Sequence, residues 1–331
     1  AVSLAADGAT LAVGATRATN EAGVETGSVY VFKEESDGWA FETKLVSETA
    51  NESAEFGRAV APSPDGRTIL VGAPMATNAE GVETGLVSVF EKRSDSWQER
   101  TTLSDAEGVQ YGEFGAAIAV SGAGQAIVGA PHKLWVDGPE GDEELESGPG
   151  AVTIFRRTED SWAQSARFKL VSGRASDEFG KAVDIAADGT TAVVGAPSRN
   201  DPEINAGSVL LFRQREEEPG WERLFRLAPA DPDAGDTFGS AVAIGADGLN
   251  LLIGARLDED PYGARAGSAY LFTRPDHAPA WEQQAKFSVD PSPYTGPSFG
   301  YTTAIDGDGS TILVGTLDGN SVYAYRDDQI E

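Results

Sequence analysis

The sequence predicts an all-β protein, a β-propeller built from four-stranded antiparallel blades, because one pattern repeats along its 331 residues. Phe-Gly pairs recur at intervals of 58, 65, 59 and 61 residues, beginning at Phe56, Phe114, Phe179, Phe238 and Phe299. Tryptophans recur in step with them, at Trp39, Trp97, Trp162, Trp221 and Trp281. Each copy also carries short apolar runs, four where the copy is complete. A period of roughly 60 residues with four strand-like runs is typical of a radial array of blades.

The second copy shows the four strands of one blade most clearly. Residues 56–62 form a run of small and β-branched residues, and the Asp-Gly pair that follows is a strong hairpin signal between apolar runs. Residues 68–71 form a continuous apolar run, as expected of a strand buried on both faces. Residues 86–90 predict a third strand. Residues 97–103 alternate between apolar and polar, which predicts a half-exposed outer strand.

The repeated phenylalanines and tryptophans are expected to be core residues. Blades converge at their inner strands, which favours small side chains there, and the gap between neighbouring blades widens outward. Large aromatic side chains fill such a gap well. We therefore interpret both aromatic series as wedges between blades rather than as a binding set.

Six copies of the first three strands predict one domain over residues 1–331, arranged as a six-bladed ring. The expected blades cover residues 1–50, 51–108, 109–173, 174–232, 233–293 and 294–331. The last copy has no tryptophan-bearing outer strand, which leaves an open edge that another domain or chain could pair with. A seven-bladed ring is the alternative if flanking sequence is missing.

Composition excludes several classes of partner. The net charge is -28 with a pI near 4.3, so nucleic acid and anionic membrane surfaces are repelled. The chain has no cysteine, which rules out disulfides and thiolate chemistry. No apolar stretch approaches the ~18 residues needed to span a bilayer. We expect neither nucleic-acid binding nor membrane insertion by this segment.

The pattern resembles the FG-GAP repeat, which occurs in the propellers of integrin α-subunits and in many microbial surface proteins. The Gly-Ala-Pro part of the signature stands at Gly72, Gly129 and Gly195, and it is altered in the other three copies. The resemblance covers essentially the whole chain. The tryptophan and the Lys-Leu pair that end several copies make it more similar to the microbial branch than to integrins.

This resemblance implies an extracellular or cell-surface protein without enzymatic activity. It implies adhesion or structural assembly through contacts with a protein partner, a neighbouring domain or another chain. It also implies calcium in the hairpin between the first two strands, where the family carries an Asp-x-Asp-x-Asp-Gly pattern. Calcium needs 6–8 oxygen ligands, and most hairpins here offer one acid or none. Only Asp306 and Asp308 form a candidate Ca²⁺ site.

Loops at one rim are the expected place for recognition, because function on such scaffolds lies in loops. The third copy inserts a long acidic loop that contains His132 and Trp135. An aromatic side chain there could stack on a sugar or anchor a partner, or it could cover the small core of its own loop. Tyr111, Tyr262 and Tyr294 are further candidates in other rim loops. A glycan-binding, lectin-like propeller is therefore the alternative function.

Catalysis finds little support in the sequence. The two histidines, His132 and His277, stand in separate loops, and no nucleophile elbow, zinc-ligand spacing or phosphate loop occurs. Carboxylate pairs can cleave glycosidic bonds, but no pair is distinguished among 53 acidic residues. A carbohydrate-active enzyme is the least favoured alternative.

Overall fold

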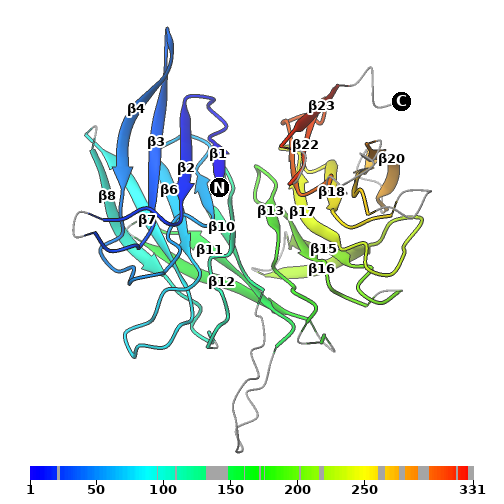
Figure 1. The fold of residues 1–331 in the computed structure, drawn as a ribbon, viewed down its shortest axis with the longest axis horizontal. Helices are drawn as coiled ribbons and strands as arrows, with labels where there is room; N and C mark the ends of the chain where they lie inside the picture. Colours follow the sequence, from blue (N-terminus) through cyan, green and yellow to red (C-terminus); the bar gives the residue numbers. More distant parts are fainter. Residues whose placement is uncertain are drawn as a thin grey trace, which may run out of the picture. The chain divides into compact units, whose positions relative to one another are not determined.

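The computed structural model folds into two compact units, Ala1–Lys169 and Leu170–Glu331 (Figure 1). Each unit contains three antiparallel sheets. Among the described residues, no helix has the length and apolar character needed to cross a bilayer. The structure describes residues 1–20, 23–94, 96–108, 110–131, 148–159, 161–170, 173–174, 176–200, 203–215, 220–259, 265–275, 280–289, 298–317 and 320–326.

The first unit holds three sheets of four strands each. The first sheet contains β1 (Val2–Leu4), β2 (Thr10–Ala15), β3 (Ser28–Glu35) and β4 (Gly38–Leu45). The second contains β5 (Val60–Pro62), β6 (Thr68–Ala73), β7 (Leu86–Arg93) and β8 (Ser96–Leu103). The third contains β9 (Ala117–Val120), β10 (Gln125–Ala130), β11 (Ala151–Arg157) and β12 (Trp162–Lys169).

The second unit holds two sheets of four strands and one of three. Its first sheet contains β13 (Val183–Ile185), β14 (Thr191–Ala196), β15 (Ser208–Gln214) and β16 (Trp221–Leu227). Its second contains β17 (Phe238–Ile244), β18 (Asn250–Ala255), β19 (Ser268–Thr273) and β20 (Glu282–Ser288). Its third contains β21 (Thr302–Ile305), β22 (Thr311–Gly315) and β23 (Val322–Arg326).

Every sheet is a meander in chain order, the arrangement of a propeller blade. The predicted fold class is confirmed: the chain is an all-β, six-bladed β-propeller, and we number its blades 1 to 6 along the chain. The register of the third and fourth strands shifts at the same place in all five complete blades, directly before Phe32, Phe90, Phe155, Phe212 and Phe272. Among the described residues of blade 6, β23 pairs only with β22.

The Asp-Gly hairpins form because the aspartate closes the turn itself. The Asp65 Oδ1 atom accepts a hydrogen bond from the Arg67 N–H at 3.1 Å. Asp7, Asp188 and Asp247 each accept one from the residue two positions ahead, at 2.8, 2.8 and 2.9 Å. A short side chain that bonds to backbone two residues ahead is the usual role of aspartate in turns. These aspartates are therefore structural.

The core lies between neighbouring blades rather than inside one sheet. One buried cluster joins Val29 and Val31 of blade 1 to Ile69 and Phe90 of blade 2, with Phe56 among them. Phe56 meets Phe90 edge-on, with ring centroids 6.0 Å apart. A single blade cannot bury both of its apolar faces, so each blade depends on its neighbours.

Candidate functional site

Within each unit, a Phe-Gly segment connects a blade to the preceding one. Phe56 forms a parallel bridge with Gly27, and its N–H donates to the Thr26 carbonyl at 3.0 Å. The same bridge recurs at Phe114 and at Phe238, and all five repeated phenylalanines are at most 1% exposed. We call this arrangement the joint. It explains why Phe-Gly lies just ahead of the inner strand β5, and not within it as the sequence suggested.

The joint requires glycine for a steric reason. A Cβ atom on Gly27 would overlap the Phe56 carbonyl oxygen, and one on Gly14 would overlap the Gly57 carbonyl oxygen. Equivalent overlaps occur at the joints of blades 2 and 3, 4 and 5, and 5 and 6. The two glycine signatures of the repeat therefore meet at one point, where two backbones approach closely. Sequence reasoning took the second signature for a strand end and missed this contact.

The tryptophan series is not uniform, which corrects the expectation that all five are buried wedges. Trp281 is 8% exposed, and Trp97 is half-buried and donates from Nε1 to Glu42 of blade 1 at 3.1 Å. Trp162 and Trp221 are also half-buried. Trp39 is 44% exposed. Trp97, Trp162 and Trp281 pack in clusters that include residues of the preceding blade, whereas Trp39 belongs to blade 1.

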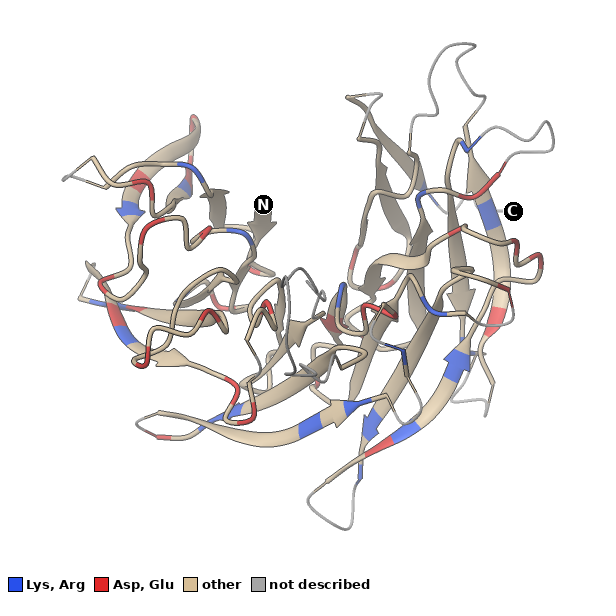
Figure 2. Ribbon diagram, turned by 60° about the horizontal axis from the view of Figure 1, so that its bottom comes forward, with Lys and Arg blue, Asp and Glu red and all other residues tan. Residues whose placement is uncertain are grey.

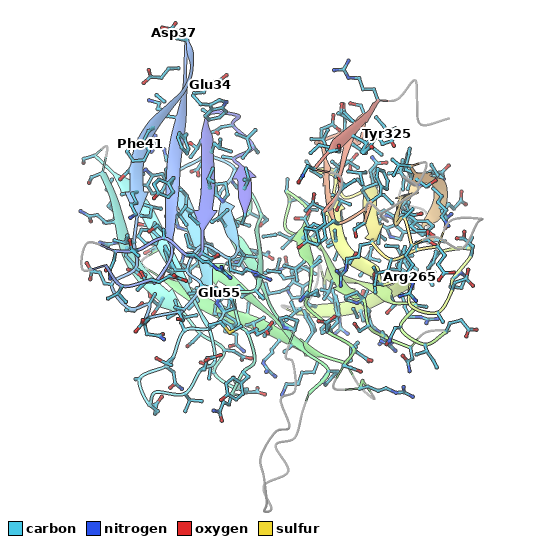
Figure 3. All side chains as sticks on the ribbon, viewed as in Figure 1. Glu34, Asp37, Phe41, Glu55, Arg265 and Tyr325 are labelled. Carbon is cyan, nitrogen blue, oxygen red and sulfur yellow. The ribbon has the colours of Figure 1, made fainter. Side chains whose placement is uncertain are left out.

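Blade 1 presents an aromatic face formed by Tyr30, Phe32, Trp39 and Phe41. Phe41 is 59% exposed, and its ring centroid lies 6.3 Å from that of Tyr30 and 5.9 Å from that of Phe32 (Figure 3). In the other complete blades the residue paired like Phe41 is polar, namely Glu99, Gln164, Arg223 and Gln283. Phe41 thus sets blade 1 apart from the other four.

In two blades, the polar residue at this position binds the loop that crosses from the preceding blade. Glu99 accepts hydrogen bonds from the Glu48 N–H at 2.9 Å and the Ser47 hydroxyl at 3.1 Å, and Gln283 accepts one from the Ala230 N–H at 3.0 Å. In both cases the donors lie in the loop that arrives from the preceding blade. Phe41 cannot accept a hydrogen bond. Blade 1 is therefore apolar at the position where blades 2 and 5 hydrogen-bond to a crossing loop.

Two apolar side chains of blade 6 are exposed. Leu313 and Val322 are 39% and 70% exposed, while their equivalents in blade 2, Leu70 and Val87, are fully buried. Asn320, with φ 44°, stands where the first five blades carry the joint glycine. A side chain at this place would meet the carbonyl of an arriving phenylalanine. Blade 6 therefore lacks the glycine on which the joint depends.

The repeats match a known family model. The model for the FG-GAP repeat matches residues 39–90, 162–212 and 221–272. Each match begins at a tryptophan, ends at the phenylalanine of the next third strand and contains one Phe-Gly pair. The protein is an FG-GAP β-propeller.

One solved structure supports the fold of this FG-GAP propeller. It is the crystal structure of a functionally unknown protein from Desulfotomaculum acetoxidans. The TM-score is 0.61 at 10% sequence identity, and the match covers 99% of this chain and 82% of the other. No curated protein matches the sequence. At this identity the similarity extends to the fold alone.

Only part of the predicted rim set lies among the described residues. Tyr111 is 41% exposed, adopts a φ of 60° and donates its N–H to the Glu83 carbonyl at 2.6 Å. This backbone conformation is uncommon for a non-glycine residue. His132, Trp135, Tyr262 and Tyr294 lie outside the described residues.

The candidate calcium pair does not fit a calcium site in the FG-GAP hairpin. Asp308 accepts the Ser310 N–H at 3.1 Å, and Asp306 accepts the Ser310 hydroxyl at 2.9 Å. Calcium needs several converging oxygens. Within the described ranges, no three acidic or histidine side chains come together as a metal site. Both aspartates serve the turn, as Asp65 does in blade 2.

A partly buried ionic cluster lies between blades 4 and 5 of the propeller. The hydroxyl of Tyr270 donates to Asp258 at 2.9 Å, and Lys286 Nζ lies 2.7 Å from Asp231 and 2.9 Å from Asp258. Burial lowers the pKa of Lys286, but hydrogen bonds to both aspartates outweigh it and raise the pKa above its usual value. Burial, together with Asp258 and Asp233, raises the pKa of Asp236 to about 6. Sequence reasoning did not find this cluster, because its members come from separate loops and strands.

Asp184 links the inner strands of the same two blades. Its Oδ2 atom accepts the Ile244 N–H at 2.9 Å, and its Oδ1 atom accepts the Ile185 N–H at 2.8 Å. Burial raises the pKa of Asp184 to about 6 despite these two hydrogen bonds. The carboxylate thus connects the inner strands of the two blades.

Proposed function

We propose that this propeller is a non-enzymatic, extracellular or cell-surface protein that serves adhesion or structural assembly through protein–protein contacts. FG-GAP repeats are typically extracellular, and their propellers commonly mediate protein interactions. The observation that carries the proposal is the aromatic face of blade 1. Exposed aromatic side chains clustered on one surface are characteristic of interaction sites.

The chemistry of the aromatic face suits a protein partner. Trp39 and Phe41 project from the outer strand β4, where both are more than two-fifths exposed. Aromatic anchors carry much of the binding energy at protein interfaces, because they bury a large area with few rotatable bonds. On blade 6, β23 has no partner other than β22 within the described part of the chain, and its Val322 is exposed, which gives a second candidate surface.

Sedimentation velocity over a range of protein concentrations tests the proposal. Wild type is expected to self-associate, or to bind a partner isolated from its native surface, and the double variant Trp39→Ser, Phe41→Ser is expected to lose that contact. Ile204→Ser is the matched control, because Ile204 is a 65% exposed apolar residue in a loop elsewhere. Equal behaviour of the double variant and the control would reject the proposal.

Glycan binding is the second candidate, and Tyr111 is the observation that favours it. Its ring is exposed, its backbone conformation is unusual, and an aromatic ring can stack on a sugar. A glycan array probed with wild type and Tyr111→Ala separates the two functions. A signal that is lost in the variant supports a lectin, and the absence of any signal leaves protein contact as the function.

A further inference from the structure

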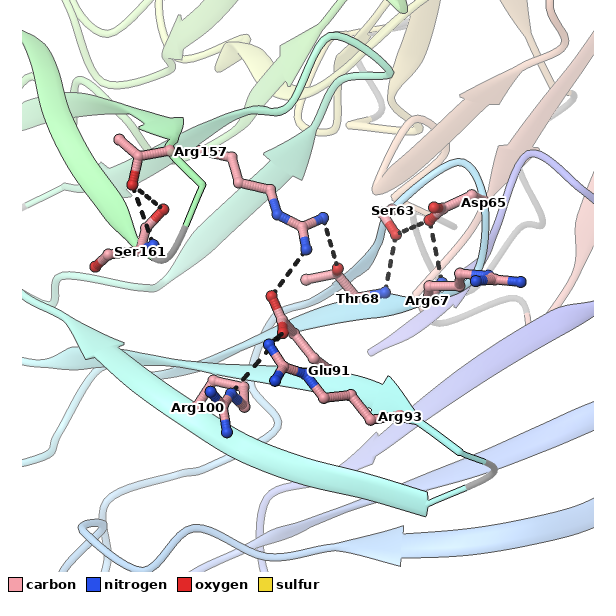
Figure 4. A network of polar contacts seen from close by, with 10 residues as sticks. Ser63, Asp65, Arg67, Thr68, Glu91, Arg93, Arg100, Arg157 and Ser161 are labelled. Carbon is pink, nitrogen blue, oxygen red and sulfur yellow. Dashed lines mark hydrogen bonds and ion pairs between the residues drawn. The ribbon is translucent and has the colours of Figure 1, made fainter.

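Three arginines converge on one glutamate at the edge where blades 2 and 3 meet (Figure 4). Glu91 accepts hydrogen bonds from Arg93 Nη2 at 3.1 Å and from Arg157 Nη2 at 2.9 Å. Arg100 Nε lies 3.9 Å from the same carboxylate. Three cations around one anion leave a local excess of positive charge. The chain as a whole is strongly acidic, with a net charge of -28, and Figure 2 shows where its basic and acidic residues lie along the ribbon.

The arginines are held in place from several strands. Arg93 lies on β7, Arg100 on β8 and Arg157 on β11. Arg157 also approaches the Thr68 hydroxyl of β6 at 3.4 Å, so its guanidinium is fixed from two sides. The Glu91 side chain is 16% exposed, against 40–59% for the three arginines. The carboxylate is covered, and the guanidinium groups face solvent.

These guanidinium groups have hydrogen-bonding capacity to spare. Each carries five N–H donors, whereas Glu91 offers two oxygens to all three. Asp65 interacts electrostatically with Arg157, and its carboxylate accepts hydrogen bonds from the Ser63 hydroxyl at 2.6 Å and the Arg67 N–H at 3.1 Å. Free guanidinium donors on a surface suit a planar oxyanion, which they bind in bidentate fashion.

We infer that Arg93, Arg100 and Arg157, here called the arginine patch, bind the carboxylates of a short acidic segment on a partner protein. The inference rests on the proposed function and names the chemistry of one partner. A long polyanion would also meet the acidic surface around the patch. A short segment meets mainly the patch, because charges farther away than about 10 Å are screened at 0.1 M salt.

The test is fluorescence anisotropy with a labelled hexaglutamate peptide. The variant is Arg93→Gln, Arg100→Gln, and Arg157 is kept because it joins two blades. The control is Arg213→Gln, Arg215→Gln, which removes the same charge from a pair of half-exposed arginines beside Glu222, at 3.7 and 3.5 Å. We expect the patch variant to bind the peptide at least about tenfold more weakly, and the control to stay within about twofold of wild type.

Three results would overturn the inference. Equal weakening in both variants would assign the binding to overall charge. A heparin-derived hexasaccharide that binds more tightly than the peptide would assign the patch to a sulfated glycan. No binding by wild type would make the network purely structural. Sedimentation of the same variants distinguishes this failure from failure of the proposed function, because contact through the aromatic face does not use the patch.

Discussion

Single glycines decide whether neighbouring blades can meet. A Cβ on Gly72 would overlap the Gly115 carbonyl oxygen of the next blade, and both partners are backbone, Gly72 in β6 and Gly115 just ahead of β9. We expect Gly72→Ala to lower the free energy of unfolding by about 2–4 kcal/mol, in the range of strained core substitutions. Chemical denaturation measures this change.

Gly81→Ala is the control for that substitution. Gly81 has φ +79°, but no atom lies within 4 Å of its Cβ position. Gly81→Ala should lower the free energy of unfolding by only about 1 kcal/mol, the cost of a left-handed backbone conformation for a residue with a side chain. Equal losses in the two variants would show that the joint has no special steric demand.

Much of the fold could be predicted from individual residues in the sequence, but little of the candidate functional site could. The Asp-Gly turns and the buried phenylalanines could be read from the sequence, because turn chemistry and apolar periodicity act over a few residues. The ionic cluster around Tyr270 could not, because Asp231, Asp258 and Lys286 meet only after two blades pack. The exposure of Trp39 was also missed, because the repeat pattern gives every copy the same environment.

At the scale of the strand, Trp97 and Trp39 occupy equivalent positions with different partners. Trp97 hydrogen-bonds to Glu42, and Lys92 Nζ lies 5.9 Å from its ring centroid and pairs with the same glutamate. Trp97→Phe should therefore cost about 1–2 kcal/mol of unfolding free energy, since a hydrogen bond to a charged group is lost. Trp39→Phe should change it by less than about 0.5 kcal/mol, because Trp39 is exposed. Equal thermal shifts in the two variants would contradict this account.

The strands and their order could be predicted closely, whereas the ends of the array could not. The expected outer strand of blade 2 covers Trp97–Leu103, and β8 spans Ser96–Leu103. Hydrophobic periodicity supplies this information locally. Phe41 and Asn320 differ from the residues at the equivalent positions of the other blades. The consequence of this difference can be recognised only once the structure shows where the joint and the crossing loop lie.

At the scale of the whole molecule, two aspartates make stability depend on pH. The pKa of Asp184 and that of Asp236 are each about 6, above the unfolded value of 3.8. The folded state therefore holds these protons more tightly, and stability falls as pH rises from about 4 to above 6. We expect the free energy of unfolding to be larger near pH 5 than near pH 7.5, by on the order of 1–3 kcal/mol, and the melting temperature to be higher.

Repulsion within the chain of charge -28 acts in the same direction as these two aspartates. Scans at high salt suppress that repulsion and leave the contribution of buried groups. The double variant Asp184→Asn, Asp236→Asn should then flatten the profile between about pH 5 and pH 7.5. A slope as steep as that of wild type would contradict the assignment to these groups. The lowered pKa values of Glu42 and Asp65 affect stability only below this range.

Hydroxyl-radical footprinting tests the role of the aromatic face most directly. The protein is labelled when dilute and again when concentrated or bound to its partner, and modification is read at Trp39, Phe41 and the buried Trp281. The account predicts strong labelling of Trp39 and Phe41 in the dilute protein and their protection on association, with Trp281 protected throughout. Association that leaves Trp39 and Phe41 fully labelled would contradict it.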